Sequence, residues 1–439
     1  MFHTIDINKR KYLFLPNSLF LFDFDSEIMQ IANDIGKIDG FNNRIDTNNK
    51  KVIKDYLEKD KKAEQYNKEF INKFNSSKIR ITGCEINVFY GCNLACKYCF
   101  ACDGGHGKQY TMTKEIARKT IDYILDNSEE SPKIKVTIIG GEPLLNMSAF
   151  KEIIEYGSIE AKKRNKKIYF ATTTNGTLLD ANNVNIFEKH NIPYMVSLDS
   201  HIKETNDYLR PGKNGESSYD DIMSNWPLIT KTKKSSVHVT VTPHNKNIFE
   251  IAQNLFDQGV YHIHFFEVKT DNEDLQFTVD DIEYLKKEYE KLSDLIIQKI
   301  TEGKNISCYP LLNYLDKLHY KKPVFLTCGT FNNRVSFAPD GNIYPCDMLM
   351  WDKYKIGNIN EGIYKDRIIE IKELLNNEDN CEECWARYLC GGECLADKLW
   401  ENKEQKALRC DLKRHVLSLK LYIYDYIVKN FKDFDFNKY

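Results

Sequence analysis

The stretch that decides the fold reads Ile86-Asn87-Val88-Phe89-Tyr90-Gly91-Cys92-Asn93-Leu94-Ala95-Cys96-Lys97-Tyr98-Cys99-Phe100. An apolar, strand-like run leads here into a short loop in which Cys92, Cys96 and Cys99 have the spacing C-x3-C-x2-C. A cube of four irons and four sulfides has four corners to ligate, so three thiolates fill three corners and leave one iron open. A structural zinc knuckle is the alternative, because Cys102 follows shortly after and could supply a fourth close ligand.

On the carboxyl side of this loop, strand-like runs and helix-like patterns alternate as far as residue 305. The first helix is expected over Thr113 to Leu125, with Thr113 as its N-cap. Such alternation predicts an α/β fold with a parallel sheet and helices outside. Six units fall short of the eight in a closed barrel, so we expect a partial (β/α)6 barrel with functional residues at the carboxyl ends of its strands. The strands are expected at 86–90, 135–139, 168–173, 194–198, 237–242 and 263–268.

Short polar motifs follow three of these strands. Gly140-Gly141-Glu142-Pro143 comes after the second strand, where two glycines let the backbone approach a ligand and the carboxylate can take an ammonium group. Thr174-Asn175-Gly176 follows the third strand, and Ser197-Leu198-Asp199 ends the fourth. Each motif alone is compatible with an ordinary turn or strand end, but their order and spacing indicate one site. His262 and His264, on one face of the sixth strand, are more typical of packing than of metal ligation.

Cysteines gather again after residue 306, where the regular alternation stops. Cys328, Gly341 and Cys346 have the order C-x12-G-x4-C. A second run has the spacing C-x2-C-x5-C-x3-C, and one more cysteine closes the set: Cys381, Cys384, Cys390, Cys394 and Cys410. Seven thiols in this arrangement can ligate nearly two iron–sulfur cubes, and zinc ribbons are the alternative.

The first 75 residues are expected to form a separate module. Short strands are predicted at 3–7, 11–15 and 19–24, and Ser26 suits the N-cap of a following helix. Residues 46–74 are helical in pattern and heavily charged. Together with the changes of pattern near 80 and 306, this predicts three domains, 1–75, 80–305 and 306–439.

Composition narrows the class of protein further. The chain has 439 residues and a net charge of −2, so no basic field marks it for nucleic acid or for a membrane surface. The sequence has no run of 18 apolar residues that would predict a membrane-spanning helix, and its first residues do not resemble a signal peptide. Thirteen cysteines without a secretion signal indicate metal sites before disulfides, and we expect a reducing cytoplasm.

The loop from Cys92 to Phe100 resembles the signature of the radical S-adenosylmethionine (radical SAM) enzymes. The resemblance implies that the open iron binds S-adenosylmethionine and that cleavage of this cofactor releases a carbon radical. It also implies that Tyr98 lies near the adenine, mainly through its backbone, and that Arg210 meets the methionine carboxylate. Ser200 stands where the family usually has glycine. The methionyl and ribose contacts implied are Gly140, Gly141, Glu142, Asn175, Ser197 and Asp199.

The later cysteines resemble the SPASM domain, an auxiliary-cluster module of radical enzymes that modify peptides. The resemblance implies three [4Fe–4S] clusters in all, with Cys308 or a substrate thiolate as the fourth ligand of the first auxiliary cluster, unless that iron is open. In a related branch, the anaerobic sulfatase maturases, an aspartate at the place of Asp347 serves as a base. The implied ligands are Cys328, Cys346 and Cys394 for the first auxiliary cluster, and Cys381, Cys384, Cys390 and Cys410 for the second.

The N-terminal module resembles the winged-helix-like peptide-recognition element of peptide-modifying enzymes. The glycine-rich stretch 102–107 resembles the thioether-forming ranthipeptide (SCIFF) maturases. These resemblances imply a maturase that cross-links a small precursor peptide bearing a leader, with a flavodoxin- or ferredoxin-type reductant. Carbon–carbon or ether links and sulfatase-maturase-like oxidation are alternatives, although the N-terminal module argues against the latter. A zinc-stabilised interaction protein is the non-enzyme alternative.

Overall fold

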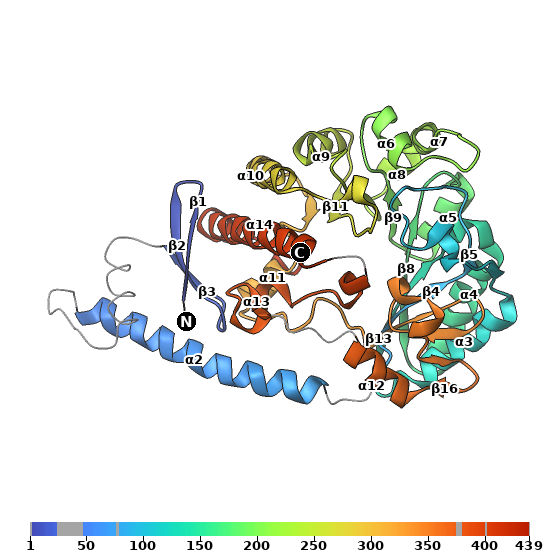
Figure 1. The fold of residues 1–439 in the computed structure, drawn as a ribbon, viewed down its shortest axis with the longest axis horizontal. Helices are drawn as coiled ribbons and strands as arrows, with labels where there is room; N and C mark the ends of the chain where they lie inside the picture. Colours follow the sequence, from blue (N-terminus) through green and yellow to red (C-terminus); the bar gives the residue numbers. More distant parts are fainter. Residues whose placement is uncertain (1, 24–46, 76–78, 375–379, 400–401, 439) are drawn as a thin grey trace.

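The computed structural model describes residues 2–23, 47–75, 79–374, 380–399 and 402–438, and its central element is an 11-stranded sheet (Figure 1). The six predicted strands are present, neighbour one another in sequence order and are all parallel. The predicted α/β fold with a large parallel sheet is therefore confirmed. These strands are β4 (Gly83–Asn87), β7 (Lys133–Ile139), β8 (Lys167–Thr174), β9 (Tyr194–Ser197), β10 (Ser235–Val241) and β11 (His262–Glu267).

The first predicted strand is split in the structure. β4 ends at Asn87, whose side chain accepts a hydrogen bond from the backbone N–H of Phe89 at 3.1 Å and so turns the chain. Phe89 and Tyr90 then form β5, which pairs with β6 (Tyr110–Thr111) in a separate two-stranded sheet. The cysteine loop lies between β5 and β6 in the chain.

The sheet also continues beyond the six predicted strands. β12 (Ser307–Tyr309) pairs parallel with β11 at one edge, and β13 (Arg334–Phe337) pairs parallel with β4 at the other. Residues after 306, expected as a separate region, therefore complete both edges of the central sheet. Three short antiparallel strands extend the β13 side: β14 (Asn342–Tyr344), β15 (Gly357–Asn358) and β16 (Gly362–Ile363).

The two faces of the sheet differ in burial. On β10 the residues Val237, Val239 and Val241 are fully buried, while the alternating residues between them are half-buried. Side chains alternate across a strand and the parallel registers align neighbours, so one whole face is packed and the other is accessible. Helices that follow the strands cover the packed face, among them α3 (Lys114–Asp126), α4 (Met147–Lys163), α5 (Ala181–Lys189) and α9 (Ile248–Asp257).

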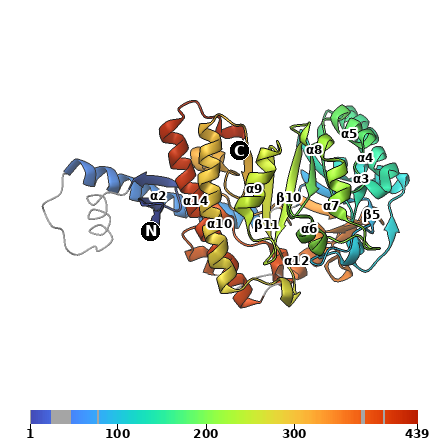
Figure 2. The same ribbon diagram turned by 90° about the horizontal axis from the view of Figure 1, so that it is seen from above.

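Helix boundaries follow local capping chemistry. The Thr113 hydroxyl accepts the N–H of Ile116 and caps α3, as predicted. α14 (Lys403–Asn430) begins before the predicted Asp411, because the side chain of Asn402 caps it by accepting the N–H of Gln405. α14 packs along α10 (Val279–Thr301), as Figure 2 shows from above. The remaining helices are α6 (Lys203–Leu209), α7 (Ser218–Ser224), α8 (Trp226–Thr230), α11 (Leu315–His319), α12 (Lys365–Leu374) and α13 (Arg387–Cys390).

The N-terminal residues form a small antiparallel sheet beside a long helix, α2 (Thr47–Asn75). The helix expected from Ser26 lies outside the described residues. This sheet packs against α14 (Figure 1), and the Arg10 guanidinium and the Tyr12 hydroxyl both donate to Asp425, at 3.0 and 3.2 Å. None of the described helices combines the length and apolarity needed to cross a membrane. The strands are β1 (His3–Ile7), β2 (Arg10–Leu15) and β3 (Phe20–Asp23).

Candidate functional site

The cysteine loop is held against the end of β7 by contacts that only glycine permits. The backbone N–H of Glu142 donates to the carbonyl of Gly91 at 3.0 Å. A Cβ atom on Gly141 would lie 2.1 Å from that same carbonyl oxygen, and a Cβ on Gly104 would lie 2.5 Å from the Cα of Gly141. Gly141, one of the two glycines predicted to approach a ligand, and Gly104 thus let three backbone segments meet beside Cys92.

The other side of the loop is fixed by backbone hydrogen bonds to the segment after α6. The N–H groups of Ala95 and Lys97 donate to the carbonyls of Pro211 and Leu209, at 2.8 and 3.0 Å. Cys92 Sγ accepts the N–H of Leu94 at 3.4 Å and the amide of Asn175 at 3.6 Å. Such N–H donors stabilise a thiolate.

The three thiols of the loop lie close enough to influence one another. Burial raises the pKa of the Cys96 thiol to about 12, the Arg210 guanidinium lowers it, and the thiols of Cys99 and Cys92 raise it further. A cleft of about 540 Å³ opens beside Cys92, lined also by Asn93, Tyr110 and Lys213. The structure therefore gathers three thiols, N–H donors and a cleft at one end of the sheet.

Glu142 is fully buried and joins the ends of β7 and β8. Its carboxylate accepts the N–H groups of Leu144 and Asn175 at 3.0 and 2.7 Å, and the hydroxyl of Thr174 at 2.8 Å. Burial raises the pKa of the Glu142 carboxyl to about 6, while these hydrogen bonds lower it. Glu142 and Asn175, predicted as ligand contacts, thus also position each other and Cys92.

Tyr98, Asp199 and Arg210 form a buried polar cluster next to Cys96. The Tyr98 hydroxyl donates to the Asp199 carboxylate and accepts from the Arg210 guanidinium at 2.6 Å. Arg210 and Asp199 also form an ion pair at 3.8 Å, and Asp199 accepts the N–H of Thr240 at 2.9 Å. Tyr98 was predicted to act mainly through its backbone, whereas here its side chain links Asp199, which follows β9, to Arg210 at the end of α6.

The later cysteines fall into two groups in space. Burial raises the pKa of the Cys346 thiol, and the charges of Asp347, Cys394 and Cys328 raise it further, so these three cysteines lie near one another. A second pocket is lined by the four thiols of Cys381, Cys384, Cys390 and Cys410. These are the same two groups that the resemblance implied as cluster ligands.

Cys308 does not join the first of these groups. It lies on β12, where Tyr309 points into a cavity, and strand alternation turns the fully buried thiol of Cys308 to the opposite face. Cys84 is also buried, in the core, as predicted. All thirteen cysteines are free thiols.

Asp347 lies half-buried in a charged cluster that the sequence did not reveal. Glu85 on β4 accepts hydrogen bonds from Arg334 and Ser336 on β13, and its charge interacts with that of Asp347. Burial raises the pKa of the Asp347 carboxyl, and Arg334 opposes the shift. Glu85 and Arg334 meet only because β13 returns to the first strand of the sheet, a pairing with no local sequence signal.

Comparison with known proteins agrees with these observations. A family model for the radical SAM superfamily matches residues 86–257. This chain is a radical SAM enzyme. The cysteine-type anaerobic sulfatase-maturating enzyme of Clostridium novyi is 28% identical to it over 333 residues, which cover 70% of this chain and 86% of that protein.

Two solved structures show the same fold as this radical SAM enzyme. Native anSMEcpe with bound AdoMet and Cp18Cys peptide has a TM-score of 0.64 at 20% identity, covering 79% of this chain and 99% of the other. Streptococcus suis SuiB bound to the precursor peptide SuiA has a TM-score of 0.52 at 15% identity, covering 92% and 96%. The second likeness extends over more of this chain than the first.

The side chains of this radical SAM enzyme fit clusters better than single metal ions. In the ranges that the structure describes, no three His, Cys, Asp or Glu side chains converge closely enough to hold one ion. Thiolates are the usual ligands of a four-iron cube, and the free thiols, gathered in groups of three and four, supply them.

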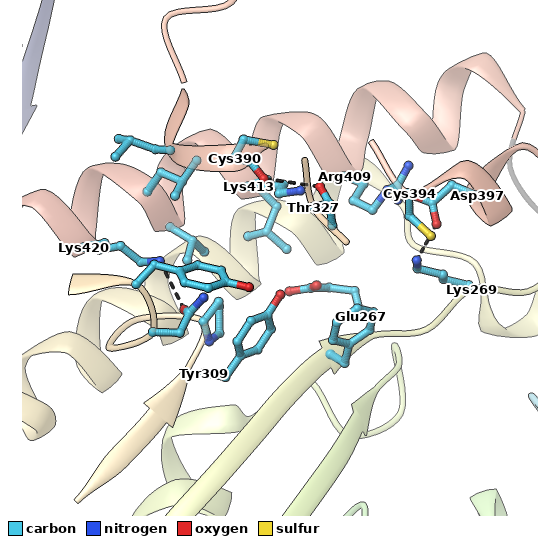
Figure 3. Close-up of a pocket in the computed structure, with 18 residues that line it drawn as sticks. Glu267, Lys269, Tyr309, Thr327, Cys390, Cys394, Asp397, Arg409, Lys413 and Lys420 are labelled. Carbon is cyan, nitrogen blue, oxygen red and sulfur yellow. Dashed lines mark hydrogen bonds and ion pairs between the residues drawn. The ribbon is translucent and has the colours of Figure 1, made fainter. Parts of the chain in front are cut away.

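A cavity of about 120 Å³ lies between the sheet edge and α14 of this radical SAM enzyme (Figure 3). Cys390 and Cys394, one from each later group, both line it. Asp397 forms ion pairs there with Lys269 and Arg409, while Lys420 donates to Asn313 at 3.1 Å. The cavity thus connects both later cysteine groups with the strand ends β11 and β12.

Proposed function

We propose that this radical SAM enzyme cross-links a ribosomally made precursor peptide by joining a cysteine sulfur to a neighbouring residue carbon. The observation that carries the proposal is the arrangement around the sheet, with the Cys92 loop and Asp347 on the β4 side and Cys394 in the cavity at the ends of β11 and β12. A peptide lying across the accessible face of the sheet would reach both places. The glycine-rich turn 102–107 packs beside Cys92, and its resemblance to the thioether-forming maturases supports the thioether chemistry.

We infer that the chain holds three [4Fe–4S] clusters and S-adenosylmethionine. When bound, the first cluster and the cofactor supply a carbon radical. Asp199 after the fourth strand, Arg210 at the end of α6 and Tyr98 in the cysteine loop would orient the cofactor, assisted by Ser197. Gly140, Gly141, Glu142 and Asn175 would hold its methionyl part. The proposed ligands are Cys92, Cys96 and Cys99; then Cys328, Cys346 and Cys394; then Cys381, Cys384, Cys390 and Cys410.

For the first auxiliary group, the burial of Cys308 on the opposite face favours a substrate thiolate or an open iron over a fourth protein ligand. Asp347 would take a proton where the link is made to carbon or oxygen. The charge of Arg334 partly compensates this carboxylate, whereas the charge of Glu85 opposes it.

The N-terminal sheet and α2 are proposed as a winged-helix-like element that binds the leader of the precursor. An extended leader can add to an exposed sheet edge through backbone hydrogen bonds. Support comes from SuiB, whose structure holds a precursor peptide and whose fold matches this chain over 92% of its length. A flavodoxin- or ferredoxin-type reductant and a reducing cytoplasm suit thirteen free thiols.

Oxidation of a residue in a sulfatase is the second candidate function. The likeness to the Clostridium novyi enzyme favours it, since 86% of that protein is covered. The N-terminal module distinguishes the candidates, because a leader-binding element serves a precursor peptide rather than a sulfatase.

The test is anaerobic co-expression with the small open reading frame nearest the gene. The expected product is lighter than the unmodified peptide by two hydrogens, with one cysteine that no longer alkylates. A modified product with every thiol free would exclude the thioether while keeping the maturase assignment. An unmodified peptide, together with conversion of a sulfatase-derived peptide, would establish the second candidate instead.

A further inference from the structure

Five rings form a continuous surface on the accessible face of the sheet. They come from three neighbouring strands, β10, β11 and β12, and we name them together the ring wall. The registers place His238 beside His264, and His264 beside Tyr309. The ring wall consists of His238, His262, His264, Phe266 and Tyr309.

The rings of this wall contact one another in sequence. The centroids of His262 and His264 lie 4.3 Å apart, and those of His264 and Tyr309 lie 5.4 Å apart with nearly parallel planes. Phe266 stands 5.9 Å from Tyr309 and 6.3 Å from His238. The wall is therefore a single surface rather than scattered side chains.

Packing against other elements does not explain the wall. Its imidazole and phenol rings are half-buried and Phe266 is 38% exposed, whereas the residues that alternate with them, such as Val239, Ile263 and Phe265, are fully buried on the other face. The expectation that His262 and His264 pack rather than ligate a metal stays a prediction, and here their rings pack on each other and on Tyr309. Nδ1 of His238 is buried and has no hydrogen-bond partner within the described parts of the chain.

The wall carries no charge near neutral pH. Burial lowers the pKa of His238 and of His262 to about 4, with Arg210 adding to the shift at His238. Burial and the neighbouring imidazoles lower the pKa of His264 to about 3. A charged side chain placed against this wall would find no counter-charge on it, while an uncharged one would gain ring contacts.

The wall also lies between the two ends of the site. His238 pairs in register with Ser197, beside the cluster of Tyr98, Asp199 and Arg210. Phe266 and Tyr309 line the cavity that contains Cys394 (Figure 3). The ring wall therefore joins the surroundings of Ser197 to the cavity that Cys394 lines.

We propose that the ring wall binds the segment of the substrate peptide that carries the residue to be modified, and that it selects an uncharged side chain at that position. The inference rests on the proposed function as far as the substrate is a peptide. It adds residues that set which side chain is accepted.

The first experiment changes the charge of the wall. His264→Glu should lower the rate of modification of the co-expressed precursor by about tenfold to hundredfold, the scale of an uncompensated charge at a contact. His264→Phe should retain most of that rate, because it keeps an uncharged ring. The matched control is His190→Glu, at the end of α5 on the packed side, which should modify the precursor normally.

A gain of function completes this test. A precursor with lysine at the modified position should be bound better by His264→Glu than by the natural enzyme. A variant that was only structurally damaged would not bind the lysine precursor better. All variants should still cleave S-adenosylmethionine. Normal modification of the natural precursor by His264→Glu would overturn the proposal and leave the proposed function intact.

A second measurement needs no precursor. Diethyl pyrocarbonate acylates neutral imidazoles, so the reconstituted enzyme can be mapped by mass spectrometry in the presence of small amides. N-acetyltryptophanamide and N-acetylleucinamide should slow acylation of His262 and His264, whereas N-acetyllysinamide should not, and His190 should react equally throughout. Equal protection by charged and uncharged amides, or none by any, would refute the selection of uncharged side chains even if the enzyme proved not to modify peptides.

Discussion

Tyr98 illustrates how one side chain links the cysteine loop to the sheet. Its hydroxyl bridges Asp199 and Arg210, which are both almost fully buried. Buried charges depend on such hydrogen bonds, because each unsatisfied group keeps its full desolvation cost. The loop position therefore depends on a phenol that the sequence motif marks only as a neighbour of Cys99.

Tyr98→Phe should destabilise the protein by about 1–3 kcal/mol, the cost of leaving a buried polar group without its partner. The same change should weaken binding of S-adenosylmethionine, because Arg210 and Asp199 lose their alignment. Thermal unfolding and equilibrium dialysis measure the two effects. Tyr110→Phe is the control, since that exposed tyrosine lines only the outer cleft. Equal losses of stability and of S-adenosylmethionine binding in both variants would contradict the bridging role of the Tyr98 hydroxyl.

Replacing Asp347 distinguishes a thioether from a carbon–carbon or ether cross-link. A thiol loses its proton more readily than a carbon or a hydroxyl group, so thioether formation depends less on a general base. Asp347→Asn should therefore retain much of the peptide-modifying activity, as should the surface control Asp352→Asn. A fall of about 10²–10⁴-fold in Asp347→Asn alone, the usual cost of losing a general base, would instead favour a carbon–carbon or ether link.

At this scale the sequence predicted which residues meet but not how they do so. The resemblance implied that Tyr98, Asp199 and Arg210 contact one cofactor, and the structure brings these three residues together. The side-chain bridge through the Tyr98 hydroxyl was not predicted, because it depends on the depth at which the loop docks. Glu85 and Arg334 were missed because 249 positions separate them and neither belongs to a motif.

At the scale of elements, the junction of β5, β7 and the turn 102–107 matters most. Gly141 and Gly104 allow backbone to contact backbone next to Cys92. No loop with a Cβ at these places could approach so closely, and the thiol would move with it. The glycines thus shape the proposed cluster site without being ligands.

Gly141→Ala should cost the enzyme its first cluster while leaving the fold in place. Iron should fall from about twelve per chain to about eight, because a cube carries four, and cleavage of S-adenosylmethionine should disappear. The combined change of Cys92, Cys96 and Cys99 to alanine should give the same result. Gly83→Ala is the matched control, since a Cβ there meets nothing within 4 Å; full iron content in Gly141→Ala would refute the argument.

Strands and helices were predicted correctly where a clear hydrophobic pattern marks a buried face. The five strands from β7 to β11 and helix α3 lie close to their predicted positions, since each has a buried face of several residues. β12 and β13 were missed because they follow residue 306, where the strand–helix alternation that also revealed the four-residue β9 has stopped. Their place in the sheet comes from tertiary pairing alone.

At the scale of the whole molecule, the C-terminal region joins all the other parts. α14 contacts α10, supplies Cys410 and holds the N-terminal sheet through Asp425. His3 and Trp385 stack with ring centroids 4.3 Å apart, so the first residues also touch the region of the second cysteine group. The three predicted domains are therefore packed together rather than connected only by linkers.

A chain that starts at Ser77 should still cleave S-adenosylmethionine slowly but should no longer bind the precursor. Fluorescence anisotropy with a labelled precursor measures the binding, and 5′-deoxyadenosine measures the cleavage. Because the truncation also uncovers α14, Arg10→Ala in the full chain is the control. Arg10→Ala weakens the contact to Asp425 but should leave the affinity for the precursor unchanged. If the truncated chain also keeps its affinity for the precursor, the N-terminal module has another role.

The position of α14 also has a consequence for synthesis on the ribosome. The N-terminal sheet is translated long before its docking surface, which includes Asp425, and β4 is translated long before its neighbour β13. Contacts so distant in the chain form late during synthesis. A nascent chain therefore cannot complete the proposed leader site or the central sheet until these later segments have emerged.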